Sequence, residues 1–333
     1  MRAVCALIAF ALGASMLQAF PVSEVEPHTI QVDGVNRSYL VHVPRCHRTS
    51  GLPVLLMLHG RGASALSASE EFGWIEKADE ECFFAVFPQA LPIDPSLPAG
   101  AKLPTDRLRG WPVKGNDVLW WTHLIAENVP HISNPKYPPI VHPLDAPFLE
   151  ALIDQLLRRY KADAKHIYVV GFSSGAEMAS DLAQFARRRI AAVAIIGSVG
   201  VSRPRRSTYR LSTLLIFGTQ DFPSRSSLAQ WDAMPPIARE KWYGQDSLPT
   251  LEQDLAAWAQ LDGCTSSRNS SIPWGIRVDW TKCEDSVRVS GISVEGLGHE
   301  WPGSRNSLWD RSRPQKPPLR LTDEIWRFFS AGN

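Results

Sequence analysis

The pentapeptide Gly171-Phe172-Ser173-Ser174-Gly175 is the strongest indication of the fold in this sequence. An apolar, strand-like run at residues 166–170 leads into it, and a helix-prone run at residues 176–183 follows. A strand that turns this sharply into a helix presents a serine hydroxyl at the turn, and the two glycines remove side chains that would collide there. The pattern therefore predicts a nucleophile elbow with Ser173 at its apex. The competing interpretation is an ordinary serine in a glycine-lined turn.

A serine hydroxyl becomes a good nucleophile only when a neighbouring base takes its proton. After a serine elbow, the acid and then the histidine are expected in chain order, on loops that follow later strands. Residues 214–217 have the sequence of a short buried strand and lead into Gly218-Thr219-Gln220-Asp221. Asp221 would then lie just past a carboxyl end of the sheet, where such sheets place their chemistry. We predict Asp221 as the acid.

The histidine is more sharply defined than the acid. Residues 290–294 have a strand-like sequence and lead into a glycine-rich stretch at residues 296–303 that contains His299. Of the nine histidines, His299 alone lies downstream of both Ser173 and Asp221. We therefore predict it as the general base, with Asp232 and Glu295 as reserve acids.

An oxyanion hole is predicted upstream of the elbow. The apolar run at residues 54–58 is typical of a buried parallel strand, and it ends in His59-Gly60-Arg61-Gly62. Hydrolases with a serine elbow take one oxyanion donor from such a loop and the other from the residue after the nucleophile. We assign the hole to the backbone N–H groups of Arg61 and Ser174. His59 is interpreted as a structural support of the loop.

These motifs resemble the family of secreted polyhydroxybutyrate depolymerases and feruloyl esterases, which are α/β-hydrolases that act on esters. The matching pieces are Leu58-His59-Gly60 with Gly62, residues 171–178 and 218–221, Gly298-His299 with Trp301-Pro302-Gly303, Asp145 with Phe148, and Trp258 with Gly263-Cys264. The resemblance covers residues 32–329 and implies a serine carboxylic ester hydrolase acting on a small or polymeric ester. Arg61 departs from the family, which often has cysteine there.

The remaining sequence predicts an α/β-hydrolase fold with a mostly parallel central sheet and helices on both faces. Asp33-Gly34 between two alternating runs predicts an antiparallel hairpin at the start of the sheet. The expected parallel strands lie near residues 54–58, 83–87, 166–170, 191–196, 213–217 and 290–294, and the expected helices include residues 148–160, 251–261 and 322–329.

An insertion rich in proline and tryptophan interrupts this pattern at about residues 88–147. It holds twelve of the 26 prolines, which exclude a long helix or a central strand, together with Trp111, Trp120 and Trp121. We expect an ordered excursion over the active-site face. Trp120 and Trp121, with Trp301 beside the histidine, are candidate substrate-binding residues. Packing under a loop is an equally good interpretation of these rings.

Length and charge set the remaining limits. A chain of 333 residues with 44% hydrophobic residues can form one catalytic domain, expected over residues 20–333 and as a monomer. A net charge of +1 provides no long-range attraction to nucleic acid or to an anionic membrane. No cofactor is expected. No metal site is expected either, because neither Cys-x-x-Cys nor His-x-x-x-His spacing occurs.

The first 19 residues have the composition of a secretory signal. Arg2 precedes an apolar stretch that ends at the small residue Ala19, and the stretch is too short to favour a permanent membrane span. We therefore expect a secreted protein, extracellular or periplasmic.

Four cysteines remain in the expected mature chain, and they can pair in three ways. We favour Cys264 with Cys283, a loop of about 20 residues worth roughly 3 kcal/mol in the chain-entropy model. Cys46 with Cys82 then follows by elimination.

Two alternatives to an esterase stay open. One is a peptidase or acyltransferase on the same scaffold. The other is a catalytically inactive hydrolase fold that binds glycans or cell surfaces through its tryptophans.

Overall fold

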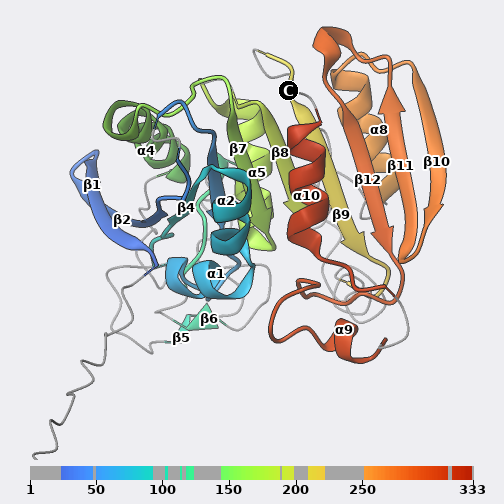
Figure 1. Ribbon diagram of the computed structural model, residues 1–333, viewed down its shortest axis with the longest axis horizontal. Coiled ribbons are helices and arrows are strands. Elements are labelled where there is room, and N and C mark those ends of the chain that lie inside the picture. The colour runs from blue at the N-terminus through green and yellow to red at the C-terminus, as the bar shows by residue number, and fades with distance from the viewer. Residues whose placement is uncertain are drawn as a thin grey trace, which may run out of the picture.

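A single ten-stranded sheet organises the protein (Figure 1). The structure is a computed structural model that describes residues 24–47, 50–92, 102–103, 113–114, 118–123, 144–187, 190–198, 209–221, 251–313 and 317–331. The strand order is β1-β2-β4-β3-β7-β8-β9-β12-β11-β10. Its strands are β1 (Glu26–Val32), β2 (Val35–His42), β3 (Val54–Leu58), β4 (Phe84–Pro88), β7 (Ile167–Phe172), β8 (Ala192–Ile196), β9 (Ser212–Gly218), β10 (Ser266–Ile272), β11 (Gly275–Thr281) and β12 (Val289–Val294). A separate two-stranded ribbon pairs β5 (Lys102–Leu103) with β6 (Val113–Lys114).

Six neighbouring strands, from β4 to β12 in the sheet order, are parallel. The predicted hairpin at one edge is confirmed, because β1 and β2 pair antiparallel around Asp33 and Gly34. A second antiparallel hairpin, β10 with β11, extends the other edge and was not predicted. Its first strand has the polar sequence SSRNSSI, which lacks the apolar alternation on which strand prediction depends.

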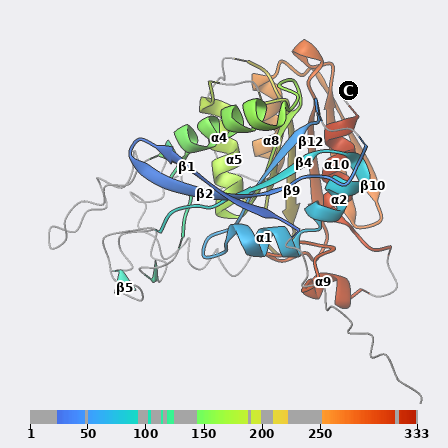
Figure 2. The same cartoon turned by 60° about the vertical axis from the view of Figure 1, so that its left-hand side comes forward.

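Helices cover both faces of the sheet, as predicted. They are α1 (Ala65–Glu71), α2 (Trp74–Glu81), α4 (Asp145–Tyr160), α5 (Ser174–Phe185), α8 (Leu251–Leu261), α9 (Leu308–Arg311) and α10 (Leu321–Ser330). Side chains of β3 alternate between two cores. Val54, Leu56 and Leu58 join the cluster beneath α4, α5 and α8, while Leu55 and Met57 join the one beneath α1, α2 and α10. Figure 2 shows α4 and α1 on opposite sides of the β1–β2 hairpin. This is the predicted α/β-hydrolase fold.

One of the two predicted disulfides is present. Cys264 and Cys283 are joined, and they flank the β10–β11 hairpin at its base. The second predicted pair, Cys46 with Cys82, is not joined in this structure, and both side chains are half-buried. Each packs against the core beneath α4 as a small apolar group, and burial of that kind does not require a bond between the sulfurs.

Several predictions lie outside the described residues, among them the leader at residues 1–19, Trp111 and Asp232. None of the helices in the described part of the chain combines the length and the apolar composition that a membrane span requires. No group of three or more potential metal ligands occurs in that same part of the chain.

Candidate active site

Ser173 occupies a strained turn between β7 and α5. Its backbone dihedrals are φ 58° and ψ −122°, a left-handed φ that side chains rarely adopt and that is often retained for function. The flanking glycines make the turn possible. A β-carbon at Gly171 would lie 2.0 Å from the carbonyl oxygen of Gly175, and one at Gly175 would lie 2.1 Å from that of Leu58. The turn has the geometry of the predicted elbow.

The acid and histidine loops lie side by side because β9 and β12 are adjacent parallel strands. Thr219 N–H donates to the carbonyl of Val294 (2.9 Å), and its hydroxyl accepts from the N–H of Gly296 (2.8 Å). Gln220 N–H donates to the carbonyl of Leu297 (2.9 Å). These bonds join the loop that carries Asp221 to the loop that carries His299.

His299 and Asp221 are in direct contact. Nδ1 of His299 lies 2.7 Å from Oδ1 of Asp221, so the imidazole donates to a carboxylate that is only 2% exposed. The side chain of His299 is 42% exposed, which leaves its other edge accessible. A buried carboxylate in this position holds the imidazole in the tautomer whose Nε2 can accept a proton. Glu295, a predicted reserve acid, instead faces Arg313.

The elbow meets this pair at the end of β8. The N–H of Ser173 donates to the carbonyl of Ile196 (2.9 Å), and the next residue, Gly197, borders the His299–Asp221 pair. A β-carbon at Gly197 would lie 3.1 Å from Oδ2 of Asp221 and 3.4 Å from Cε1 of His299. Among the described residues, no hydrogen bond joins the Ser173 hydroxyl to His299. Catalytic hydrogen bonds often form only when substrate is bound.

The two predicted oxyanion donors lie beside the elbow. Ser174 is the first residue of α5, where an N–H has no acceptor within the helix and the helix dipole favours negative charge. Arg61 follows Gly60, whose added β-carbon would lie 3.4 Å from Cβ of Ser173. Both segments therefore adjoin Ser173.

His59 supports the loop that carries Arg61, the predicted oxyanion donor. Its ring is fully buried, with Nδ1 donating to the carbonyl of Gly60 (2.8 Å) and Nε2 accepting from the N–H of Ala90 (3.2 Å). Burial lowers the pKa of His59 to about 4, and the bond to Gly60 offsets only part of that effect. His59 is therefore neutral at pH 7, which suits one donating and one accepting nitrogen.

The three tryptophans predicted to bind substrate are all buried, which favours packing over contact with a substrate. Trp120, Trp121 and Trp301 are 0%, 2% and 3% exposed. The indole N–H of Trp120 donates to the carbonyl of His59 (2.8 Å), and its ring packs 5.1 Å from the imidazole. The rings therefore pack beneath the residues of the site, in agreement with the packing interpretation that the sequence left open.

Sequence reasoning missed Gly197 and Thr219. Gly197 has φ +64° and directly follows β8, a buried parallel strand. A glycine at the carboxyl end of such a strand is the sequence signal that could have identified it. Thr219 lies within the motif quoted for Asp221, but its hydroxyl bond to Gly296 spans 77 positions and leaves no local signal.

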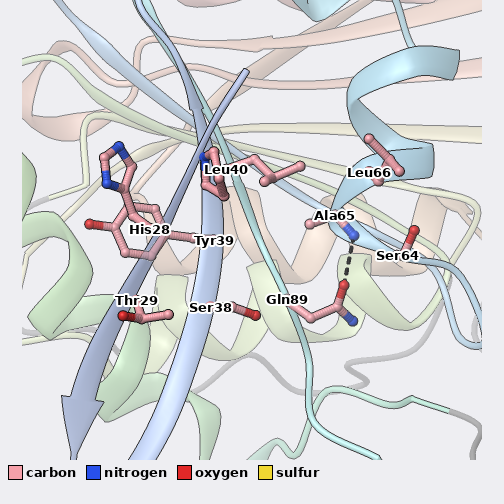
Figure 3. A pocket seen from close by; sticks show the side chains of 10 residues that line it. His28, Thr29, Ser38, Tyr39, Leu40, Ser64, Ala65, Leu66 and Gln89 are labelled. Carbon is pink, nitrogen blue, oxygen red and sulfur yellow. Dashed lines mark hydrogen bonds between the residues drawn. The ribbon is translucent and has the colours of Figure 1, made fainter. Parts of the chain in front are cut away.

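A hollow of about 330 Å³ lies beside β1, β2 and α1 (Figure 3). None of Ser173, Asp221 and His299 lines it. Gln89 connects it to the predicted oxyanion loop, because its Oε1 accepts from the N–H of Ala65 (2.9 Å) and its Nε2 lies 3.3 Å from Nε2 of His59. The hollow is therefore distinct from the space beside His299.

No protein-family model matches the sequence. Two curated proteins are similar in sequence. "Putative esterase NocK" of Nocardia uniformis subsp. tsuyamanensis is 31% identical over 173 residues, which cover 48% of this chain and 49% of that protein. "Bifunctional acetylxylan esterase/xylanase XynS20E" of Neocallimastix patriciarum is 21% identical over 279 residues, which cover 83% of this chain and 33% of that protein. The matches thus span half or less of either relative.

A solved structure agrees with the fold. Acetyl xylan esterase from Aspergillus awamori superposes with a TM-score of 0.52 and 12% sequence identity, covering 91% of this chain and 98% of that one. A sequence identity this low supports a similarity of fold and nothing more.

Proposed function

We propose that this chain is a serine carboxylic ester hydrolase. The observation that carries the proposal is the 2.7 Å contact between His299 and buried Asp221, beside a serine held at a left-handed φ. The similarity to two proteins named as esterases supports the same reaction class.

In the proposed reaction, Nε2 of His299 takes the proton of the Ser173 hydroxyl while Oγ attacks the ester carbonyl. Asp221 holds the imidazole and stabilises the imidazolium that forms. The N–H groups of Arg61 and Ser174 bind the oxyanion, and losing one such donor typically costs about 2.7–4 kcal/mol. His299 then protonates the departing alcohol, and water, activated by the same imidazole, releases the acid from the acyl-enzyme.

Substrate and location are finer parts of the proposal. The resemblance to polyhydroxybutyrate depolymerases and feruloyl esterases, together with the acetylxylan esterase named among the relatives, favours esters found on extracellular polymers. The signal-like residues 1–19 and the Cys264–Cys283 disulfide favour secretion of a single catalytic domain at residues 20–333. A panel of acetylated xylan, methyl ferulate, short p-nitrophenyl esters and polyhydroxybutyrate film separates the substrate classes.

The reaction class is tested with Ser173→Ala. Hydrolysis of p-nitrophenyl acetate or butyrate is expected to fall by at least about a thousandfold, because the nucleophile is lost while the fold is kept. Ser267→Ala, on the exposed edge strand β10, is the matched control and should keep full activity. Substantial turnover by a folded Ser173→Ala protein would exclude the proposed mechanism.

A further inference from the structure

The ring that precedes the proposed nucleophile stacks on the proposed base. The ring centroids of Phe172 and His299 are 4.9 Å apart, and their planes differ by 25°. Phe172 is the last residue of β7 and the direct chain neighbour of Ser173, whereas His299 lies 127 positions further along the chain, after β12. The residue beside the nucleophile therefore contacts the base face to face.

The hydrogen bond to Asp221 does not by itself fix the plane of His299. It holds one nitrogen, and the ring can still pivot about that contact, since the side chain is 42% exposed. A flat contact on one face removes that freedom and fixes the direction of Nε2. Phe172 provides such a contact.

Phe172 is itself held from behind by buried rings. Its centroid lies 6.0 Å from that of Phe72 and 6.1 Å from that of Trp301, with both pairs edge to face. Phe72 and Trp301 pack on each other at 4.5 Å, and the indole N–H of Trp301 donates to the hydroxyl of Thr322 in α10 (3.3 Å). The ring against His299 thus rests on the core rather than on solvent.

Gly197 leaves the space that this stacking needs. A β-carbon there would lie 3.0 Å from Cε2 of Phe172, in addition to its close approaches to Asp221 and His299. All three side chains surround one glycine at φ +64°, a conformation that also disfavours any other residue.

We propose that Phe172 and Gly197 form a seat that orients His299, and that both are positioning residues for the reaction. This inference rests on the proposed function, because it assigns the orientation of the proposed base. The seat links the two partners of the proton transfer, since the same turn of chain carries Ser173 and the ring that aims the imidazole.

The test compares Phe172→Leu, which removes the flat face, with Phe172→Tyr, which keeps it. The Leu variant is expected to lose on the order of 10- to 100-fold in kcat with little change in KM, because misdirection of a catalytic group costs that much. The Tyr variant should retain most of the activity. Phe83→Leu is the control for core packing, because Phe83 is fully buried against Trp326 in the same layer and does not contact His299.

A second readout does not depend on turnover. The proton between Nδ1 of His299 and Asp221 gives a low-field proton resonance in the NMR spectrum when it is sheltered from exchange. That resonance should be lost or broadened in Phe172→Leu and kept in Phe172→Tyr and Phe83→Leu. If the wild type hydrolyses no ester, the proposed function fails while this resonance still decides whether the seat exists.

Gly197→Ala provides an independent variant should Phe172→Leu fold poorly. The added methyl group is expected to displace the imidazole and to produce the same selective loss of kcat and of the resonance. Wild-type kcat and an unchanged resonance in a folded Phe172→Leu or Gly197→Ala protein would overturn the proposal. An equal loss in Phe83→Leu would overturn it too, because the effect would then belong to core packing.

Discussion

Asp262 is a buried carboxyl group at the end of α8, 5% exposed, and its Oδ2 has no hydrogen-bond partner among the described residues. Burial raises its pKa to about 7. Nearby Arg210 opposes that shift, and Asp285 adds to it. The neutral form therefore suits the folded protein, and ionisation of this group works against folding as the pH rises.

Asp262→Asn is expected to flatten the dependence of stability on pH. Between about pH 4 and 7 the folded state holds a proton that the unfolded state has released, so the free energy of unfolding falls with rising pH, by at most about 1.4 kcal/mol per unit. The Asn variant should gain stability relative to wild type at pH 8 compared with pH 5. Urea unfolding at both pH values measures this.

Glu252→Gln, on the exposed face of the same helix, is the control and should leave the slope unchanged. A wild-type slope in Asp262→Asn would show that Asp262 titrates near its ordinary pKa.

Some residues of the candidate site could be predicted from their neighbours or their order in the sequence, whereas others depend on contacts that form only in the folded chain. The turn at Ser173 could be predicted because the tight turn requires glycine at the positions two residues before and two residues after it. His299 could be predicted because of its place in chain order. Phe172 stacking on His299 could not, since the contact joins residues 127 positions apart and depends on how β7 and β12 sit in the finished sheet.

The β10–β11 hairpin reaches from the disulfide to the histidine loop. Cys264 and Cys283 close its base, and at its tip the carbonyl of Trp274 accepts from the N–H of Glu295 (2.7 Å). The carbonyl of Glu295 in turn accepts from the indole of Trp309 (3.0 Å). The hairpin thus supports the segment that leads to His299.

Loss of the Cys264–Cys283 disulfide is expected to destabilise the protein. Replacing both cysteines with serine should lower the free energy of unfolding by about 3 kcal/mol, the entropy of closing a loop of this length. Denaturant unfolding measures the difference. A reductant should lower the stability of wild type toward that of the double variant and leave the double variant unchanged; equal stability of both proteins without reductant would contradict the expectation.

Strands could be predicted where burial requires a run of apolar residues in the sequence. Three of the six parallel strands, β3, β4 and β8, are buried at every position, so their sequences are almost continuous apolar runs such as Val54–Leu58. The hairpin strand Ser266–Ile272 lies at an edge and is mostly polar, and it is defined by its hydrogen bonds to β11 rather than by its own side chains.

A buried ion pair ties distant parts of the whole molecule together. Arg37 of β2 and Asp145 at the start of α4 are 2% and 0% exposed and form a salt bridge. The second oxygen of Asp145 accepts from the N–H of Trp121 (2.6 Å), and the guanidinium lies 4.0 Å over the ring of Phe148. The β1–β2 hairpin, α4 and the segment that contains Trp121 therefore meet at this one ion pair.

Arg37→Met is expected to destabilise the protein by about 3–5 kcal/mol, because it leaves the Asp145 carboxylate buried without its partner. Adding Asp145→Leu should recover part of that loss, since no uncompensated charge remains. A double-mutant cycle from chemical unfolding measures the coupling. Additive effects of the two substitutions would show that the pair contributes no coupling.

We propose that Ser173, His299 and Asp221 act as one catalytic unit. Treatment of the folded protein with a fluorophosphonate probe, followed by peptide mass spectrometry to locate the label, tests this claim. We expect a single label on Ser173 in wild type, and strongly slowed labelling in His299→Ala, because the hydroxyl then lacks its base. A label on another residue, no label, or equal labelling rates in both proteins would contradict the claim.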